Sequence, residues 1–490
     1  MIWHHREVVK RRSLFPARLL PAIVTAFAAI LLSFAAAAQT GGGLTVPPIP
    51  FTQFKLDNGL RVVLSVDRTL PVVTESMIFD VGARDERPGH SGFAHLFEHL
   101  MFEGSKNAPK GVFDQIVEGH GGNDNASTHQ DYTFYYESVP SNVLPAIMWL
   151  DADRLANLDV TAANMKNQIA VVEEEKRMRV DNAPYGPLLY VDMGQAAFSN
   201  WQNAHPVIGS FKDLDAATLA DVQEFFREYY APRNAILVIV GDIDPVNTKA
   251  LVEHYFGWIP NRSSITPVNT AEPPPAAEKT VTVHDPQAKL PAVSMAWQGP
   301  KRNTTDFYAL SMLGQLLFDG DSSLLYQALV KDQQVAIEVD GGLGFPNADY
   351  TDYRSPGLFG GVVIQKPGVS AERIQDLVFQ QIQQVEATGV PAGEMSRLKT
   401  KFSAEWMKSQ QTTRGRAEML ALATLFDGNP DAANAALSNF LAVTSGQMQQ
   451  VARTYLTHAR TSVVVDLPGP APASPDAPAA APAAANGSAQ

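Results

Sequence analysis

The sequence predicts an α+β protein built from two homologous halves, each an antiparallel sheet with helices. Segments that alternate between apolar and polar residues precede longer segments of helical periodicity, unlike the regular alternation of a doubly wound parallel sheet. A stretch rich in Pro, Ser, Thr and Ala, residues 262–279, divides the chain. The two bodies on either side of it end in similar patterns.

Those endings are a capped helix followed by a β-branched strand. We interpret the match as internal duplication, although helix-then-strand segments also recur by chance. The corresponding features are Thr218 and Thr444 as N-caps, Asp221 and Gln447 three residues later, Tyr229 and Tyr455 at the helix ends, and strands over residues 236–240 and 462–465.

In the first body, Asp57-Asn58-Gly59 between alternating apolar positions predicts a hairpin. Residues 72–82 and 133–140 are rich in β-branched and aromatic side chains and predict strands. Helices are predicted to follow, with Ser141 and Thr161 as their N-caps.

Composition narrows the functional classes. The chain has 490 residues, a formal net charge of −13 and no cysteine. An acidic chain without basic runs in its body argues against nucleic acid as the main partner. Without cysteine, any metal must be held by histidines and carboxylates.

The N-terminus is typical of a secretory signal peptide. A basic stretch precedes an apolar one, and small residues stand at Ala36 and Ala38, which predicts a signal over residues 1–38 and export to the periplasm. Because about 20 apolar residues can also span a bilayer, the alternative is a retained anchor facing the periplasm. No later stretch is long and apolar enough to span a membrane, so the mature chain is expected to have no membrane span.

The rest of the chain is divided by composition. We expect a flexible lead-in over residues 39–50, a first body over 51–261, a linker over 262–279, and a second body over 280–466. The tail, residues 467–490, is nearly all Pro, Ala, Gly and Ser and is expected to be disordered, because it lacks the residues that form a core.

The segment "HLFEH" suggests a metal site. On a helix, His95 and His99 lie on one face and can bind one cation, and neutral imidazole suits Zn²⁺. Glu98 beside them can deprotonate a metal-bound water that attacks a carbonyl. The alternative is a pair of surface or packed histidines, but the flanking apolar residues predict a buried helix, where two unliganded imidazoles are costly.

A catalytic zinc needs a third protein ligand and one open position. Glu173, Glu174 and Glu175 are the candidates. On a helical wheel the inner face lies about 40° from Glu175 and about 120–140° from the other two, so Glu175 is predicted as the ligand and its neighbours as a solvated face. Gln168, on the same stripe, is predicted to orient a His or Glu175. The apolar positions that define this inner face are Met165, Ile169, Val171, Val172 and Met178.

On these motifs the chain resembles the pitrilysin/insulinase family of zinc metallopeptidases, in the branch that includes mitochondrial processing peptidase and bacterial relatives. The family's third ligand follows the second His of the motif by about 76 residues, which is the spacing from His99 to Glu175. The resembling segments are "LDNGLRVVL", "VGARDERPGHSGFAHLFEHLMFEGS", "VVEEEKRMRVDNAPYG", "YYAPRNAILVIVGD" and "GDSSLLYQALV".

The resemblance implies two halves that face each other around an enclosed chamber and one Zn²⁺ per chain, bound by His95, His99 and Glu175, with Glu98 as the base. It also implies that "NDNASTHQDYTFYY" forms the edge strand of the active site. Asn125 and Ala126 would then lie along a bound peptide, and the substrates would be unfolded peptides small enough to enter.

One stretch departs from the family. Relatives usually supply an Arg and a Tyr from a segment like "LReexGLaY", whereas this chain has "LVKDQQVAI", with Val330 and Ile337 at those positions. Neither side chain donates a hydrogen bond, and loss of such donors lowers rates by about 10²–10³. Lys331 can substitute in part. We expect a homologous partner subunit, in a heterodimer, to supply the missing pair; a homodimer is the other possibility.

The leading interpretation is therefore an exported zinc endopeptidase. Two alternatives stay open: a non-catalytic assembly subunit of the same family, and a zinc-dependent peptide-binding protein without turnover.

Overall fold

The computed structural model describes residues 46–262, 264–347, 349–352, 354 and 356–469. The predicted signal peptide and most of the predicted tail lie outside these residues, as does the first part of the lead-in. By its internal contacts the chain divides into two units, Met1–Pro47 and Pro48–Gln490. The architecture described below is that of the second unit.

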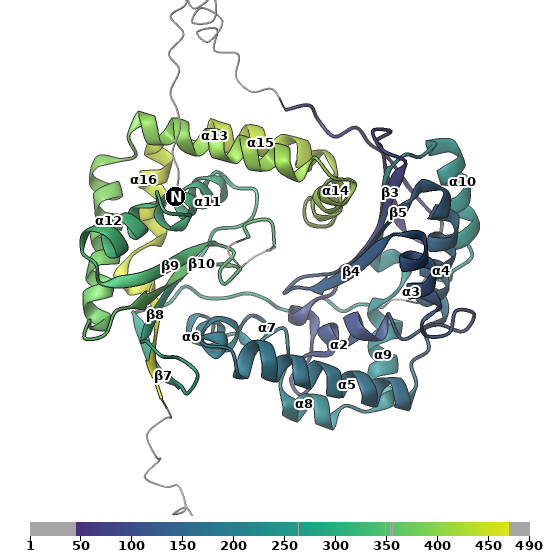
Figure 1. Cartoon of the computed structure of the whole chain (residues 1–490), viewed down its shortest axis with the longest axis horizontal. Coiled ribbons are helices and arrows are strands. Elements are labelled where there is room, and N and C mark those ends of the chain that lie inside the picture. Colours follow the sequence, from purple (N-terminus) through teal and green to yellow (C-terminus); the bar gives the residue numbers. More distant parts are fainter. Residues whose placement is uncertain (1–45, 263, 348, 353, 355, 470–490) are drawn as a thin grey trace, which may run out of the picture. The chain divides into compact units, whose positions relative to one another are not determined.

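In the described residues, the first body forms a six-stranded sheet in the order β1-β2-β6-β3-β5-β4 (Figure 1). β2 and β6 run parallel, and every other neighbouring pair is antiparallel. The predicted hairpin is confirmed as β1 and β2, with Gly59 in the left-handed region at φ 99°. The strands are β1 (Thr52–Lys55), β2 (Arg61–Val66), β3 (Val72–Phe79), β4 (Asn123–Thr128), β5 (Thr133–Pro140) and β6 (Ala235–Gly241).

The described part of the second body forms a five-stranded sheet in the order β7-β11-β8-β10-β9. β7 and β11 run parallel and the other pairs are antiparallel, which repeats the order and directions of β2-β6-β3-β5-β4. This repetition confirms the predicted homologous halves. The strands are β7 (Lys279–Asp285), β8 (Ala292–Gln298), β9 (Ala336–Leu343), β10 (Leu358–Gln365) and β11 (Ser462–Pro468), so the last strand includes two residues that were predicted to belong to the tail.

Helices cover both sheets. Those before the linker are α2 (Phe93–Leu100), α3 (Val112–Val117), α4 (Leu144–Asn157), α5 (Ala162–Lys176), α6 (Met193–Ala197), α7 (Trp201–Ala204), α8 (Phe211–Ala216), α9 (Leu219–Tyr229) and α10 (Pro245–Phe256). Those after it are α11 (Thr305–Phe318), α12 (Ala371–Thr388), α13 (Ala392–Ser409), α14 (Thr413–Asp427), α15 (Asp431–Ala442) and α16 (Ser445–Tyr455).

Most of the predicted helix caps are present. Thr218 and Thr444 form capping boxes with the residues three positions later, and Thr161 accepts a hydrogen bond from Asn164 N. The prediction for Ser141 was wrong. Ser141 begins a 3₁₀ turn, Ser141–Val143, and α4 starts only after it, without a side-chain cap.

Each body also covers a face of the other body's sheet. α14 packs on β3 and β6 of the first sheet, with Leu420 and Ala421 against Ile78 and Val238. In return, α6 packs on β8 and β11 of the second sheet. Because both faces of both sheets are covered in this way, the two bodies share two of their hydrophobic cores.

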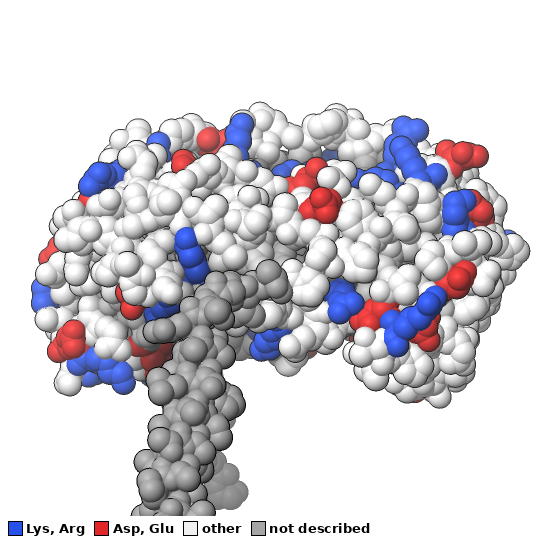
Figure 2. All heavy atoms as spheres, turned by 90° about the horizontal axis from the view of Figure 1, so that it is seen from above, with Lys and Arg blue, Asp and Glu red and all other residues white. Residues whose placement is uncertain are grey.

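The surface carries charges of both signs. On the face shown in Figure 2, acidic and basic side chains lie interspersed among a larger area of uncharged residues. Within the described ranges, every helix is too short or too polar to cross a bilayer.

The first core contains an unusual group of charges, formed by Glu75 on β3, Glu137 on β5, and Asp151 and Arg154 on α4. All four side chains are buried, and Glu75 lies directly opposite Glu137 in the sheet. Arg154 Nη2 lies 2.6 Å from Glu137 Oε1 and 2.9 Å from Asp151 Oδ1, whereas Glu75 faces the Asp151 carboxyl and, among these described side chains, forms no ion pair with Arg154 within 4.0 Å. One guanidinium thus faces three carboxyl groups.

Glu75 is therefore predicted to be protonated in the folded protein. Burial raises its pKa well above the usual value, and the Asp151 and Glu137 carboxyls raise it further. When the pKa of a carboxyl is higher in the folded than in the unfolded state, its contribution to stability is fully present at a pH below the unfolded-state pKa. That contribution is lost as the pH rises through the folded-state pKa.

We predict that Glu75→Gln, which removes the ionisation, becomes more stable relative to the wild type as the pH rises from 5 to 8. For a domain of the size of the first body, residues 51–261, about 1 kcal/mol corresponds to about 2–4 °C, so thermal melts should resolve the trend. Glu137→Gln removes the carboxylate that contacts Arg154 Nη2 and should destabilise the fold more than Glu75→Gln does. A Glu75→Gln variant whose relative stability does not change with pH would contradict the assignment.

Candidate metal centre

The N-terminus of α2 is fixed by a buried carboxylate. Glu86 Oε2 accepts a hydrogen bond from Gly92 N (2.9 Å) and Glu86 Oε1 accepts one from Ala94 N (2.8 Å). These N–H groups have no partner within the helix, and the negative charge is favoured at this end of the helix dipole. His205 Nε2 lies 3.0 Å from Glu86 Oε2, and its ring stacks on Trp201 at 3.8 Å. His205 is thus a structural residue, in keeping with its lack of metal-ligand spacing in the sequence.

The apolar face of α2 packs on α9 and leaves the opposite face for the histidines. Phe97 stacks on Phe225 with ring centroids 5.0 Å apart, and Tyr230 packs on it at 5.2 Å. His95 and His99 point away from this core, with ring centroids 4.9 Å apart. The "HLFEH" segment is helical as predicted.

Glu175, near the end of α5, meets both rings. Its Oε2 lies 3.3 Å from His99 Nε2 and 3.7 Å from His95 Nε2, and among the described residues these three form the single group arranged to hold a metal ion. A tetrahedral zinc ion with bonds of about 2.0–2.2 Å keeps its ligand atoms roughly 3.3–3.6 Å apart. The observed distances and the two-imidazole, one-carboxylate donor set therefore fit zinc.

The charge states also suit a cation. Burial, together with the neighbouring His99, lowers the pKa of His95 to about 4, so this ring is neutral, the form that binds metals. Hydrogen bonding to His99 and the positive groups around it lower the pKa of Glu175, so its carboxylate is ionised at neutral pH.

Glu98 lies beside this group and is held by the edge strand. Its Oε2 accepts a hydrogen bond from Thr128 Oγ1 (2.6 Å), the last residue of β4. Burial raises the pKa of Glu98, and the Thr128 hydrogen bond opposes this in part. The structure thus places a carboxylate of raised basicity between the candidate ligands and the open edge of the first sheet.

Glu175 lies against the two histidines, and its role as a ligand stays a prediction, whereas two apolar residues that were assigned to the same inner face lie outside it. Val171 and Met178 are 43% and 61% exposed, although both were assigned to the inner face. Met178 lies beyond the end of α5, in a π-helical turn over Arg177–Asp181 whose different pitch rotates it outward. Glu174 is exposed as predicted, but the prediction for Glu173 was wrong, since its side chain is only 15% exposed and forms an ion pair with Arg177.

Gln168 is buried on the predicted face of α5, but its hydrogen bond runs elsewhere. Its Nε2 donates to Glu103 Oε1, and Lys110 forms an ion pair with the same carboxylate. Its predicted contact with a ligand is therefore replaced by one with Glu103.

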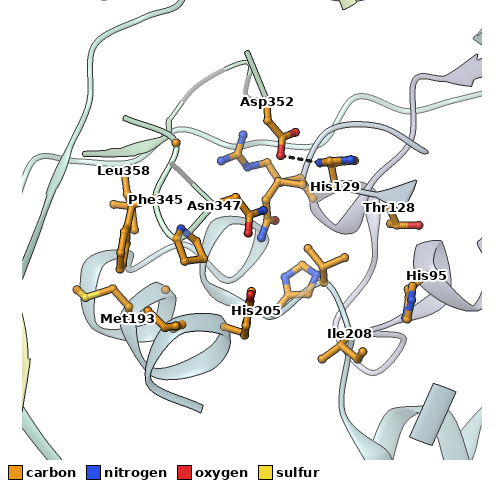
Figure 3. Close-up of a pocket in the computed structure, with 18 of the residues that line it drawn as sticks. His95, Thr128, His129, Met193, His205, Ile208, Phe345, Asn347, Asp352 and Leu358 are labelled. Carbon is orange, nitrogen blue, oxygen red and sulfur yellow. Dashed lines mark hydrogen bonds and ion pairs between the residues drawn. The ribbon is translucent and has the colours of Figure 1, made fainter. Parts of the chain in front are cut away.

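A cavity of about 600 Å³ adjoins the candidate centre and is lined by both bodies (Figure 3). His95, Glu98, Thr128 and Glu175 line one part of it. An apolar part is lined from both bodies by Leu189, Met193, Phe198, Phe345 and Leu358. The space has room for peptide side chains next to the centre.

A polar contact between the bodies crosses the cavity wall, as the dashed line in Figure 3 shows. His129 Nδ1 lies 2.6 Å from Asp352 Oδ2, and His129 Nε2 lies 2.9 Å from Ser127 Oγ. Burial opposes protonation of the ring, but the Asp352 carboxylate outweighs it, and the pKa of His129 is raised. Because the two partners are 223 residues apart, no spacing in the sequence signals this contact.

The other predicted site residues lie as follows. Asn125 and Ala126 are on β4, the edge strand, and Asn125 Oδ1 accepts a hydrogen bond from Ala126 N (2.8 Å). Val330 is half-buried against the second core, and Ile337 is exposed on β9. Neither belongs to the described residues that line the cavity, and Lys331 lies over the ring of Tyr326 at 5.2 Å.

The sequence and the fold are similar to those of known peptidases. The family model described as insulinase (peptidase family M16) matches residues 61–209, and the one described as peptidase M16 inactive domain matches residues 216–402. The zinc protease PqqE of Helicobacter pylori is 30% identical over 369 residues, which are 75% of this chain and 81% of that protein. The chain belongs to the insulinase family of peptidases.

Two solved protease structures share the fold. The crystal structure of a protease from Helicobacter pylori superposes with a TM-score of 0.81 at 26% identity, covering 86% of this chain and all of that one. The periplasmic protease PqqL from Escherichia coli superposes with a TM-score of 0.69 at 16% identity, covering 86% of this chain and 48% of the other, which supports the fold alone.

Proposed function

We propose that this member of the insulinase family is a zinc-dependent endopeptidase that cleaves peptides and unfolded segments. The observation that carries the proposal is the convergence of His95 Nε2, His99 Nε2 and Glu175 Oε2 on one point, with the Glu98 carboxylate beside it. The relative named a zinc protease supports the choice of metal.

His95, His99 and Glu175 would hold one zinc ion per chain. When bound, the ion supplies a Lewis acid that polarises a carbonyl and makes water more acidic. The three residues leave a fourth position open, as catalytic zinc sites require. The neutral His95 ring and the ionised Glu175 carboxylate can bind the ion without first losing a proton.

Glu98 would act as the base. It accepts the proton of the attacking water, and its raised pKa brings its basicity closer to neutral pH, where a general base is most effective. The Thr128 hydroxyl holds one of its oxygens, so the position of the base is tied to β4. After attack, the protonated Glu98 can pass its proton to the departing amine.

The peptide would bind as an extra strand. β4 is the edge of the first sheet and packs against α2, so a strand added there runs past the candidate centre. Main-chain hydrogen bonds to an edge make little demand on sequence, while the adjoining cavity receives side chains. Asn125 would have to release Ala126 N before that N–H can bind a peptide carbonyl.

We also propose that the protein works outside the cytoplasm. The basic-then-apolar pattern of residues 1–38 supports export. The E. coli protein of similar fold is named a periplasmic protease.

We predict that Glu98→Gln binds zinc like the wild type and loses peptide hydrolysis by at least about 10²-fold, because the amide cannot accept the proton. Metal content by mass spectrometry and cleavage of an unfolded fluorogenic peptide measure the two effects. Glu174→Gln, an exposed change on α5, is the control and should keep both. Substantial hydrolysis by Glu98→Gln would show that another group is the base.

A non-catalytic assembly subunit is the second candidate function. The apolar Val330 and Ile337 favour it, and so does the description of the family model that matches residues 216–402 as an inactive domain. We prefer an intermediate arrangement, in which this chain carries the zinc and base and a homologous partner supplies an Arg and a Tyr.

This arrangement predicts that the purified chain alone hydrolyses peptides slowly. Adding a homologue whose corresponding segment carries Arg and Tyr should raise kcat by about 10²–10³-fold, the effect of restoring oxyanion donors. The matched control is the same homologue with that Arg and Tyr replaced by Val and Ile. Full activity of the isolated chain would exclude the need for a partner.

A further inference from the structure

The two oxygens of Glu175 have different partners. Oε2 faces His99 and His95, whereas Oε1 lies 2.7 Å from Arg179 Nη1. The Glu175 side chain is 16% exposed and that of Arg179 is 74% exposed, so the guanidinium reaches over the carboxylate from the solvent side. Arg179 also lines the cavity beside His95 and Glu98.

The backbone that carries Arg179 is held in place. Arg179 lies in the π-helical turn over Arg177–Asp181 that follows α5. A Cβ on Gly186 would lie 2.2 Å from Val180 O, so the chain after the turn packs directly on it. Tyr185 N then donates to Asp285 Oδ2 (2.7 Å) at the end of β7, which ties this segment to the second body.

The neighbouring arginine points elsewhere. Arg177, two residues earlier, lies 3.2 Å from Glu173 and 3.3 Å from Glu174, so its ion pairs are with these two residues instead of with Glu175. The turn thus presents two arginines of equal charge, one against the candidate ligand and one away from it.

The contribution of the Arg179–Glu175 pair to stability is small. Exposed ion pairs four residues apart on a helix add little to stability, because solvent screens the charges. Its geometry has a larger consequence. A carboxylate with two free oxygens can bind a cation through either or both of them, whereas one with Oε1 engaged offers only Oε2.

We propose that Arg179 is a positioning residue for the metal centre. It holds Glu175 so that a single carboxylate oxygen faces the imidazoles and the remaining coordination position stays open. The inference rests on the proposed zinc function, because it assumes that the ion binds between these three side chains. Groups that fix a ligand's orientation typically contribute 10–100-fold to metal affinity or activity.

Electrostatics alone makes the opposite prediction. A guanidinium close to a divalent cation repels it, so removal of Arg179 should strengthen zinc binding if the residue contributed only its charge. The direction of the change in affinity therefore separates positioning from simple repulsion.

The test compares Arg179→Gln with Arg177→Gln in the full chain, with zinc affinity measured by competition with a chromophoric chelator. We expect Arg179→Gln to bind zinc 10–100-fold more weakly and Arg177→Gln to stay within about twofold of the wild type. Arg179→Lys keeps the charge but donates through one point, and should fall between them. Circular dichroism and thermal melts of the metal-free variants check that folding is unchanged.

A second readout reports the coordination of the metal. In the cobalt-substituted protein, freeing Oε1 should raise the coordination number and weaken the visible absorption bands of Arg179→Gln relative to the wild type. Zinc affinity of Arg179→Gln equal to or higher than that of the wild type would overturn the positioning role and leave the proposed function intact. A wild-type chain that binds no zinc would instead overturn the proposed function.

Discussion

The structure depends on one meeting point, where a carboxylate from α5 reaches two imidazoles from α2 across 76 residues of chain. Three groups that favour a cation lie together at the edge of a hydrophobic core, and a divalent ion satisfies all of them at once. Local structure accounts for the pair His95 and His99, since four residues separate them on a helix. Glu175 lies next to these rings because α5 packs against α2 in the first body.

Much of the fold that creates this point serves to hold α2 still. Glu86 binds the free N–H groups at its start, and Phe97 anchors its buried face on α9. Thr128 then links the Glu98 carboxylate to the edge strand. The candidate metal ligands, the proposed base and the proposed peptide-docking edge are thus linked through α2, and catalysis by preorganised groups would require such a link.

The sequence predicted the features that depend on local pattern. The paired histidines, the capping boxes at Thr218 and Thr444 and the hairpin at Gly59 all follow from short-range chemistry. It failed where long-range packing or unusual backbone geometry decides. The π-helical turn after α5 moves Met178 to the surface.

Contacts between segments that are distant in the chain could not be predicted from the sequence either. The packing of α14 on the first sheet and of α6 on the second depends on how the two bodies pack. The contact between His129 and Asp352 depends on the same packing. No spacing in the sequence signals such contacts, because their partners lie hundreds of residues apart.

The most direct test of the central claim is a crystal structure of the zinc-loaded protein with anomalous data collected at the zinc edge. The account predicts one zinc peak per chain at about 2.0–2.2 Å from His95 Nε2, His99 Nε2 and Glu175 Oε2. A peak elsewhere, or Glu175 turned away from the two rings, would contradict it.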